Sequence, residues 1–247
     1  MDRQVVIVDY GMGNLYSVAR AVEAAGGVPL ITSDPGTVDR ASALIMPGVG
    51  TFGDCMANLR KTGLLPALRR YLESDRPYLG ICLGMQVLFE AGEETPGVEG
   101  IGFFKGKAVR IPTGEKLPHV GWNRLCCLRK DAFVSGQDGG HHYYIHSYCC
   151  EPEDGDIVTA TTDYGMEMVA AVEKGRVLGL QFHPEKSDRQ GILLLRKFID
   201  GAYGTGKAAS ASGESSAETY GTEKMRTAAV EASAADPGRK KGAGDPC

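Results

Sequence analysis

The sequence has no apolar run of about 18 residues, the usual minimum for a helix that spans a membrane. Its 247 residues carry a formal net charge of -4, so they supply no basic surplus for a nucleic-acid backbone. The N-terminal segment has one brief apolar run, interrupted by an aspartate, and no signal-peptide cleavage pattern follows it. These absences predict a cytoplasmic protein that binds neither membranes nor nucleic acids.

Cysteine is present, but without the spacing of a metal site. Zinc-binding cysteines usually lie about two to four residues apart, whereas those here are single or directly adjacent, as in Cys126-Cys127 and Cys149-Cys150. An odd total of seven cysteines predicts a reducing compartment, with no metal and no other cofactor. Because neighbouring residues of a strand face opposite sides, we expect one cysteine of each pair in the core.

The first half of the chain alternates strand-like and helix-like segments. Short apolar runs, each meeting glycine, occur at "QVVIVDY", "ALIMPG" and "PYLGIC". Between them, apolar residues at helical spacing occupy residues 15–25 and the stretch "LLPALRRYLES". This alternation predicts βαβ units and a largely parallel sheet.

The second half is dominated by strands. "KAVRIP", "YYIHSYCC", "DIVTATT" and "EMVAAVEKGRVLGLQF" predict successive strands, and "EKGR" predicts a hairpin connection. "RQGILLLRKFID" predicts a last helix, with Ile192, Leu195, Phe198 and Ile199 on one stripe. The predicted fold class is therefore α/β, a three-layer α/β/α arrangement around a mixed, mostly parallel central sheet.

After Tyr203 the composition changes to Gly, Ala, Ser, Glu and Lys. Such a segment lacks the spaced large apolar residues that offset the entropy of ordering. We therefore predict one folded domain, residues 1–203, and a disordered low-complexity tail, residues 204–247. An induced helix around "EKMRTAAVEA" is the alternative interpretation for part of the tail.

The stretch "PYLGICLGMQ" places Cys82 between Gly80 and Gly84, after an apolar run and before a helix-like run. Small neighbours allow the sharp strand-to-helix turn of a nucleophile elbow, which exposes the thiol above the sheet. The following helix N-terminus would favour a thiolate, and the amide of Leu83 would point toward a developing oxyanion. Glycine-flanked cysteines also occur for packing alone, so this motif needs support from elsewhere in the chain.

The stretch "LGLQFHPEKS" supplies a base and a group to orient it. His183 and Glu185 are two residues apart, which places them on the same side of an extended segment that Pro184 would end. A cysteine, a histidine and a carboxylate, distant in sequence, form a catalytic triad if the fold brings them together. A lone histidine is more often structural; of the others, we predict that His141 and His142 are solvated loop residues.

Five motifs resemble those of the class I (triad-type) glutamine amidotransferases: "PGVGTFGDCM", "GICLGMQ", "HVGWN", "YYIHSY" and "QFHPEKS". Within that class they are similar to the family of glutaminase subunits of imidazole glycerol phosphate synthase, from histidine biosynthesis. The resemblance runs in order from "VVIVDYGMGNLYSV" to the final helix near Ile199 and implies a flavodoxin-like fold. The tail beyond Tyr203 is not part of the family pattern.

The resemblance implies a role for each matching residue. Cys82 would attack the carboxamide of L-glutamine, His183 would transfer the proton to the leaving ammonia, and Glu185 would orient the imidazole. The amides of Leu83 and of the Val49-Gly50 segment would bind the oxyanion. The glutamine substrate would be held by three further positions, Gln86, Ser147 and Tyr148.

The resemblance also implies a partner, a (β/α)8-barrel cyclase that forms a heterodimer with this chain and receives its ammonia. Asn14 and Trp122 are the interface candidates, with a core position as the alternative for Trp122. In the family, the "PGVG" strand is thought to hold an oxyanion donor turned away until the partner binds its nucleotide substrate. We therefore expect the isolated chain to be a poor glutaminase.

Other interpretations remain open at this point. The chain could be the glutaminase partner of pyridoxal phosphate synthase, a γ-glutamyl hydrolase, or a binding module that keeps the fold without the chemistry. "PGVG" followed by "TFGD", together with "HVGWN", argues against the first two. The glycines of "GMGN" suggest a phosphate site, but without a complete phosphate-binding motif they favour a helix-initiating turn.

Overall fold

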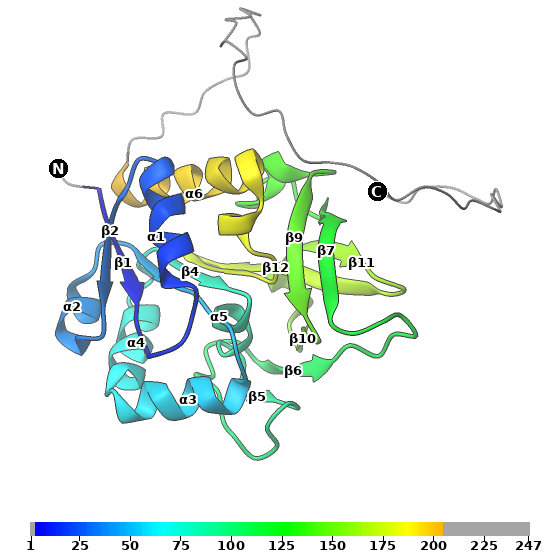
Figure 1. Ribbon diagram of the computed structural model, residues 1–247, viewed down its shortest axis with the longest axis horizontal. Coiled ribbons are helices and arrows are strands. Elements are labelled where there is room, and N and C mark those ends of the chain that lie inside the picture. The colour runs from blue at the N-terminus through cyan, green and yellow to red at the C-terminus, as the bar shows by residue number, and fades with distance from the viewer. Residues whose placement is uncertain (1–2, 205–247) are drawn as a thin grey trace, which may run out of the picture. The chain divides into compact units, whose positions relative to one another are not determined.

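A computed structural model describes residues 3–204 and has an eight-stranded central sheet (Figure 1). The predicted tail, 204–247, lies outside the described residues except for Gly204. The strand order is β2-β1-β3-β4-β13-β12-β11-β8. The pairings from β2 to β13 are parallel and those from β13 to β8 are antiparallel. The predicted mixed, mostly parallel sheet is thus confirmed. The strands are β1 (Gln4–Val8), β2 (Val28–Thr32), β3 (Leu44–Met46), β4 (Tyr78–Ile81), β8 (Cys126–Cys127), β11 (Val158–Asp163), β12 (Glu167–Lys174) and β13 (Val177–Leu180).

Helices cover both faces of this sheet, which gives the predicted three layers (Figure 1). Strand β1 shows why: Val5 and Ile7 join the core cluster under α1 and α6, whereas Val6 and Val8 join the cluster under α3 and α4. Because helices cover both faces of the sheet, the successive side chains of residues 5–8 are all buried. Their sequence is therefore a continuous apolar run. The helices are α1 (Leu15–Ala24), α2 (Pro35–Arg40), α3 (Phe52–Lys61), α4 (Leu64–Glu73), α5 (Leu83–Gln86) and α6 (Asp188–Tyr203).

Two smaller sheets lie beside the main one. One has the order β10-β6-β5, and the other pairs β7 with β9 in antiparallel register. Their strands are β5 (Ala91–Gly92), β6 (Gly106–Arg110), β7 (His119–Arg124), β9 (His141–His146) and β10 (Tyr148–Pro152). Short 3-10 helices complete the described part: η1 (Ser135–Gln137), η2 (Gly155–Ile157) and η3 (Pro184–Lys186). The single strand predicted for "YYIHSYCC" is therefore divided at Ser147, because its two halves pair with different sheets.

The prediction of solvated loop histidines is wrong for His142. Both His141 and His142 lie in β9, where exposed and buried residues alternate, and only His141 faces outward. The His142 side chain is fully buried, with its ring centroid 4.3 Å from that of Phe182. Burial lowers the pKa of His142 to about 4, so this ring is neutral at physiological pH.

The prediction of one core cysteine per adjacent pair is also wrong. Cys149 and Cys150 are both buried, because β10 is covered on both faces: Cys149 packs with Val109 and Met168, whereas Cys150 joins the main core. Cys126 and Cys127 are both partly exposed. In residues 3–204, no helix is long and apolar enough to cross a membrane.

Candidate active site

Cys82 lies on a sharp turn between β4 and α5. Its backbone has φ 53° and ψ -108°, a left-handed conformation that is uncommon for a residue with a side chain. Its N–H donates to the carbonyl of Leu180 on β13 at 2.7 Å, which fixes the turn against the sheet. Strain of this kind persists only where the surrounding structure enforces it, and it is concentrated at functional sites.

The glycines beside Cys82 are required by close backbone packing. A Cβ atom on Gly80 would lie 2.4 Å from the carbonyl oxygen of Gly84. A Cβ on Gly84 would lie 2.0 Å from the carbonyl oxygen of Met46, at the end of β3. The turn therefore has no room for a larger residue at either position, as the elbow pattern predicts.

The helix that follows Cys82 is shorter than the sequence suggests. α5 has four residues, Leu83–Gln86, so it supplies a local group of amides rather than the summed dipole of a long helix. Leu83 is its first residue, and its N–H has no acceptor within the helix. The helix therefore contributes the unpaired N–H of Leu83 beside the sulfur.

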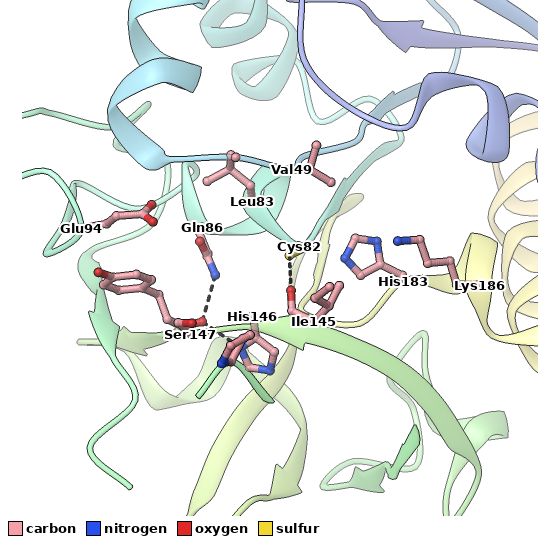
Figure 2. Close-up of a pocket in the computed structure, with 13 residues that line it drawn as sticks. Val49, Cys82, Leu83, Gln86, Glu94, Ile145, His146, Ser147, His183 and Lys186 are labelled. Carbon is pink, nitrogen blue, oxygen red and sulfur yellow. Dashed lines mark hydrogen bonds between the residues drawn. The ribbon is translucent and has the colours of Figure 1, made fainter. Parts of the chain in front are cut away.

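Besides the ring of His183, two polar groups lie next to the sulfur of Cys82. Nε2 of Gln181 donates to Sγ at 3.6 Å, and the thiol faces the carbonyl oxygen of Ile145 at 4.0 Å (Figure 2). Cys82 is 7% exposed, so the sulfur is reached through the pocket and not from open solvent.

His183 and Glu185 form a buried pair at the carboxyl end of β13. His183 Nδ1 and Glu185 Oε1 are 2.7 Å apart, and each side chain is 2% exposed. The strand ends at Leu180, earlier than predicted, and Glu185 lies in η3. The two groups therefore meet because of a 3-10 turn, not because of strand alternation. Ser187 stabilises this turn by donating from Oγ to the carbonyl of His183 at 2.7 Å.

The pKa of His183 is strongly shifted from the ordinary histidine value. Burial by itself lowers its pKa, but the adjacent Cys82 sulfur and the Glu185 carboxylate outweigh burial and raise the pKa of His183 to about 10. Among the described residues, Nε2 of His183 has no hydrogen-bond partner, and the ring lies beside Cys82 in the pocket (Figure 2). This arrangement favours an imidazolium beside the Cys82 sulfur.

One pocket of about 320 Å³ joins these groups, a volume suited to a ligand the size of an amino acid. Cys82 and His183 line it together with all six predicted binding residues: Val49, Gly50, Leu83, Gln86, Ser147 and Tyr148. Glu185 lies behind His183. The sequence did not single out the remaining lining residues, which are Glu94, Pro118, Ile145, His146 and Lys186.

Glu94 is the most informative of the missed residues. Its Oε2 accepts a hydrogen bond from the N–H of Phe52 at 2.7 Å, at the start of α3. In Figure 2 its carboxylate lies on the side of Gln86 away from His183, so the pocket has an acidic end and a catalytic end. An acidic pair, Glu93-Glu94, directly after a glycine was the available signal.

Gln86 is held by two acceptors. Its Nε2 donates to the carbonyl of Tyr148 at 3.0 Å and to Oε1 of Gln181 at 3.1 Å. Since Gln181 in turn donates to Cys82, the two amide side chains connect the strand β10 to the sulfur.

The "PGVG" segment follows β3, next to the elbow. A Cβ on Gly48 would lie 2.5 Å from the amide nitrogen of Gly84, so this glycine is needed for close approach. Gly50 has φ +96° and would also bring a Cβ within 2.2 Å of the end of the Met12 side chain. Val49 between them is 38% exposed.

The two interface candidates lie at the surface. Asn14 is exposed and caps α1, accepting from the N–H of Ser17 at 3.4 Å. Trp122 is 49% exposed, so a core position is wrong for this residue. Within residues 3–204, no group of His, Cys, Asp or Glu side chains is arranged to hold a metal ion.

Comparison with known proteins gives the class. The family model described as glutamine amidotransferase class-I matches residues 6–201. The chain therefore belongs to the class I glutamine amidotransferase family.

Curated relatives narrow the resemblance further. A protein named imidazole glycerol phosphate synthase subunit HisH, from Methanothermobacter thermautotrophicus, is 45% identical over 196 residues, covering 79% of this chain and 98% of the relative. The protein of the same name from Aquifex aeolicus is 43% identical over 197 residues, covering 79% and 95%. The resemblance read from the sequence motifs is confirmed.

Solved structures support the fold alone, because their sequences are distant. A glutamine amidotransferase crystal structure matches with a TM-score of 0.65 at 20% identity, covering 81% of this chain and 98% of that one. PurLQS from Thermotoga maritima matches with a TM-score of 0.64 at 21% identity, covering 83% and 99%.

Proposed function

We propose that residues 1–203 form the glutaminase subunit of imidazole glycerol phosphate synthase, acting in the cytoplasm. The subunit hydrolyses L-glutamine to glutamate and ammonia. It passes the ammonia to a (β/α)8-barrel cyclase, which releases imidazole glycerol phosphate and an aminoimidazole carboxamide ribonucleotide in histidine biosynthesis. The observation that carries this proposal is the strained Cys82 turn in one pocket with His183, itself paired to buried Glu185.

The chemistry follows from the triad. The Cys82 thiolate attacks the carboxamide carbon, and His183 Nε2–H gives its proton to the departing ammonia. Water then attacks the glutamyl thioester, His183 accepts a proton from that water, and glutamate leaves as the thiolate is restored. Glu185 keeps the proton on Nδ1 of His183, so that Nε2 faces the reacting atoms.

The oxyanion of the tetrahedral intermediates is bound by backbone donors. The N–H of Leu83 is free of intrahelical bonding and adjoins the nucleophile. A second donor comes from the Val49-Gly50 peptide. Such a donor typically contributes on the order of 10²–10³ in rate.

The other end of the pocket holds the amino-acid group of glutamine. The carboxylate of Glu94 suits the α-ammonium, and its position is fixed by the N–H of Phe52. Gln86, Ser147 and Tyr148 also line the pocket, and Gln86 lies between Glu94 and Cys82 (Figure 2).

The cyclase docks on the outer face of the β7–β9 hairpin and the start of α1. Val120, Trp122 and Ile145 are 52%, 49% and 39% exposed, and Val120 pairs directly with Ile145. Ile145 also lines the pocket, so this apolar face adjoins the site that releases ammonia. Asn14 lies at the exposed start of α1.

Glutamine turnover of the reconstituted pair tests the function. We expect glutamate release to be slow for the isolated chain and faster when the cyclase and its nucleotide ligand are present. Equal rates in both conditions would refute the gating by the Val49-Gly50 peptide, and no glutamate in either would refute the function.

A further inference from the structure

Two buried histidines, of which His146 lines the pocket and His119 does not, have no role in the chemistry above. His119 on β7 and His146 on β9 are directly paired in the hairpin and are 3% and 6% exposed. His119 Nδ1 and His146 Nε2 are 3.0 Å apart, so one proton lies between the two rings.

The neighbours of His146 determine where that proton resides. His146 Nδ1 lies 2.9 Å from the carbonyl oxygen of Tyr148, which can only accept, so Nδ1 carries a hydrogen. Nε2 of the neutral ring is then an acceptor. Nδ1 of His119 must therefore be the donor to His146, which leaves His119 Nε2 as an acceptor.

On the side of His119, the contacts of Asn123 independently require that Nε2 of His119 is an acceptor. Asn123 Nδ2 donates to the carbonyl of Asp163 at 2.6 Å, while Asn123 Oδ1 accepts from the N–H of Arg124 at 2.8 Å. The amide cannot be reversed, so Nδ2 faces Nε2 of His119 at 3.3 Å as a donor. A second proton on either ring would set an N–H of His119 against this amide.

On the side of His146, the series of hydrogen bonds extends to the sulfur of Cys82. The Tyr148 carbonyl accepts from both His146 and Gln86. Gln86 donates to Gln181, which donates to Sγ of Cys82. Every donor in this series has an acceptor only if both histidines are neutral and protonated at Nδ1.

We propose that His119 and His146 are positioning residues, a neutral pair with fixed protons that holds the Tyr148 carbonyl, and through it the Gln86 and Gln181 amides, in the orientation that glutamine hydrolysis needs. The inference rests on the proposed function. The pair also connects the pocket to β7, the strand that carries exposed Val120 and Trp122.

The surroundings of the pair support its neutrality. His119 lies against the rings of Tyr164 and Tyr144, with centroids 4.1 and 5.0 Å away. Burial, opposed by the Tyr148 carbonyl and reinforced by the nearby His119 and His183, lowers the pKa of His146 to about 4. Burial also lowers the pKa of His119.

NMR of the full chain with labelled histidines tests the proton positions without any assay of activity. We expect the ring nitrogens of His119 and His146 to report neutral Nδ1–H tautomers from neutral pH down to about one unit below the ordinary histidine pKa of about 6.5. An Nε2–H tautomer for either ring, or titration of either at that ordinary pKa, would overturn the proposal.

Kinetics of the pair reconstituted with cyclase and nucleotide ligand test the positioning role. His146→Phe removes the donor to Tyr148, so we expect kcat/KM for glutamine to fall about 10-fold, mostly through KM. His146→Asn can still donate from the Nδ1 position and should recover most of that loss. His141→Phe, an exposed position on the same strand, is the matched control and should resemble wild type.

Wild-type kinetics for His146→Phe would overturn the positioning role. Failure of the wild-type pair to hydrolyse glutamine would instead refute the proposed function, while the tautomers measured by NMR would still decide whether the histidine pair exists.

Discussion

Two glycine-bearing strand ends lie side by side in this molecule, since β3 and β4 are parallel neighbours. In the elbow after β4, residues 80–84, both glycines are required because a side chain would strike the backbone. In the segment after β3, residues 47–50, Gly48 is needed for close approach but Gly50 for its left-handed conformation. The same sequence signature therefore has two physical causes.

The two strand ends differ in mobility: the Cys82 turn is a fixed group, whereas the Val49-Gly50 peptide is an adjustable one. The buried Cys82 turn is held by β13 and by contacts on both sides. Val49 is exposed, and the conformation of Gly50 allows the peptide between them to rotate at little cost. We infer that the nucleophile is preorganised and that any control by a partner acts on the Val49-Gly50 peptide.

The largest effect is expected for Cys82→Ala, which removes the fixed group. Glutamine-dependent synthesis by the reconstituted pair should fall by at least about 10³-fold, because no other thiol lies on the elbow. Synthesis from ammonium salts should persist, since only the nitrogen supply is lost. Residual glutamine-dependent synthesis within about 10-fold of wild type would show that another group is the nucleophile.

Glu185→Gln should lower glutamine turnover on the order of 10²-fold or more, because the neutral amide no longer fixes and stabilises the imidazolium.

The contribution of the His183-Glu185 pair to folding stability depends on pH with a defined sign. The pKa of His183 is raised to about 10 in the folded state, so its pairing stabilises fully below the unfolded pKa of about 6.5 and is lost as pH rises toward 10.

The measurement is the free energy of unfolding of wild type and Glu185→Gln, from about pH 6 to about pH 10. We expect the advantage of the wild type to shrink as pH rises through this range. An advantage that grows with pH would contradict the charged His183-Glu185 pair.

Gly84→Ala and Gly50→Ala test the comparison directly. At Gly84 the new Cβ would meet the Met46 carbonyl at 2.0 Å, so unfolding should become easier by about 3 kcal/mol. At Gly50 the new Cβ would meet only the flexible end of the Met12 side chain, which can move. The free energy of unfolding should therefore fall by about 1 to 2 kcal/mol, because of the left-handed backbone conformation alone.

The functional effects should run in a different order from the stability effects. Gly50→Ala should abolish most of the activation of glutamate release by the partner, although it remains the more stable variant. If the partner activates Gly50→Ala as much as wild type, control does not depend on rotation of the Val49-Gly50 peptide. Thermal unfolding and partner-stimulated glutamate release measure the two effects.

The smallest effect concerns the partner surface. Val120→Asp places a charge on the outer face of the β7–β9 hairpin and should raise the Kd for the cyclase about 10-fold or more. Leu128→Asp is the matched control, because Leu128 is 55% exposed but follows β8 on another sheet. Equal Kd values for the two variants, measured by calorimetry, would remove β7 from the interface.

The sequence predicted the elbow and the base because each depends on a few adjacent residues. Gly80, Cys82 and Gly84 specify one turn, and His183 with Glu185 specify another. It did not predict β2, whose Pro29 is tolerated because β2 is an edge strand of the central sheet.

The rest of the pocket depends on contacts between distant segments. Glu94 is placed by α3, Gln181 meets Gln86 across 95 positions of sequence, and His146 meets His119 through a hairpin. No local periodicity reports such pairings. Division of one apolar run at Ser147 between two sheets was equally hidden, because each half has the pattern of a strand.

Labelling with a glutamine-like electrophile tests the central claim, that Cys82 is the reactive thiol of a glutamine site. The full chain, with cyclase and nucleotide ligand, is treated with the reagent and digested for mass spectrometry. We expect one adduct, on Cys82, that glutamine prevents. An adduct on Cys149, Cys150 or another cysteine, or labelling that glutamine leaves unchanged, would contradict the account.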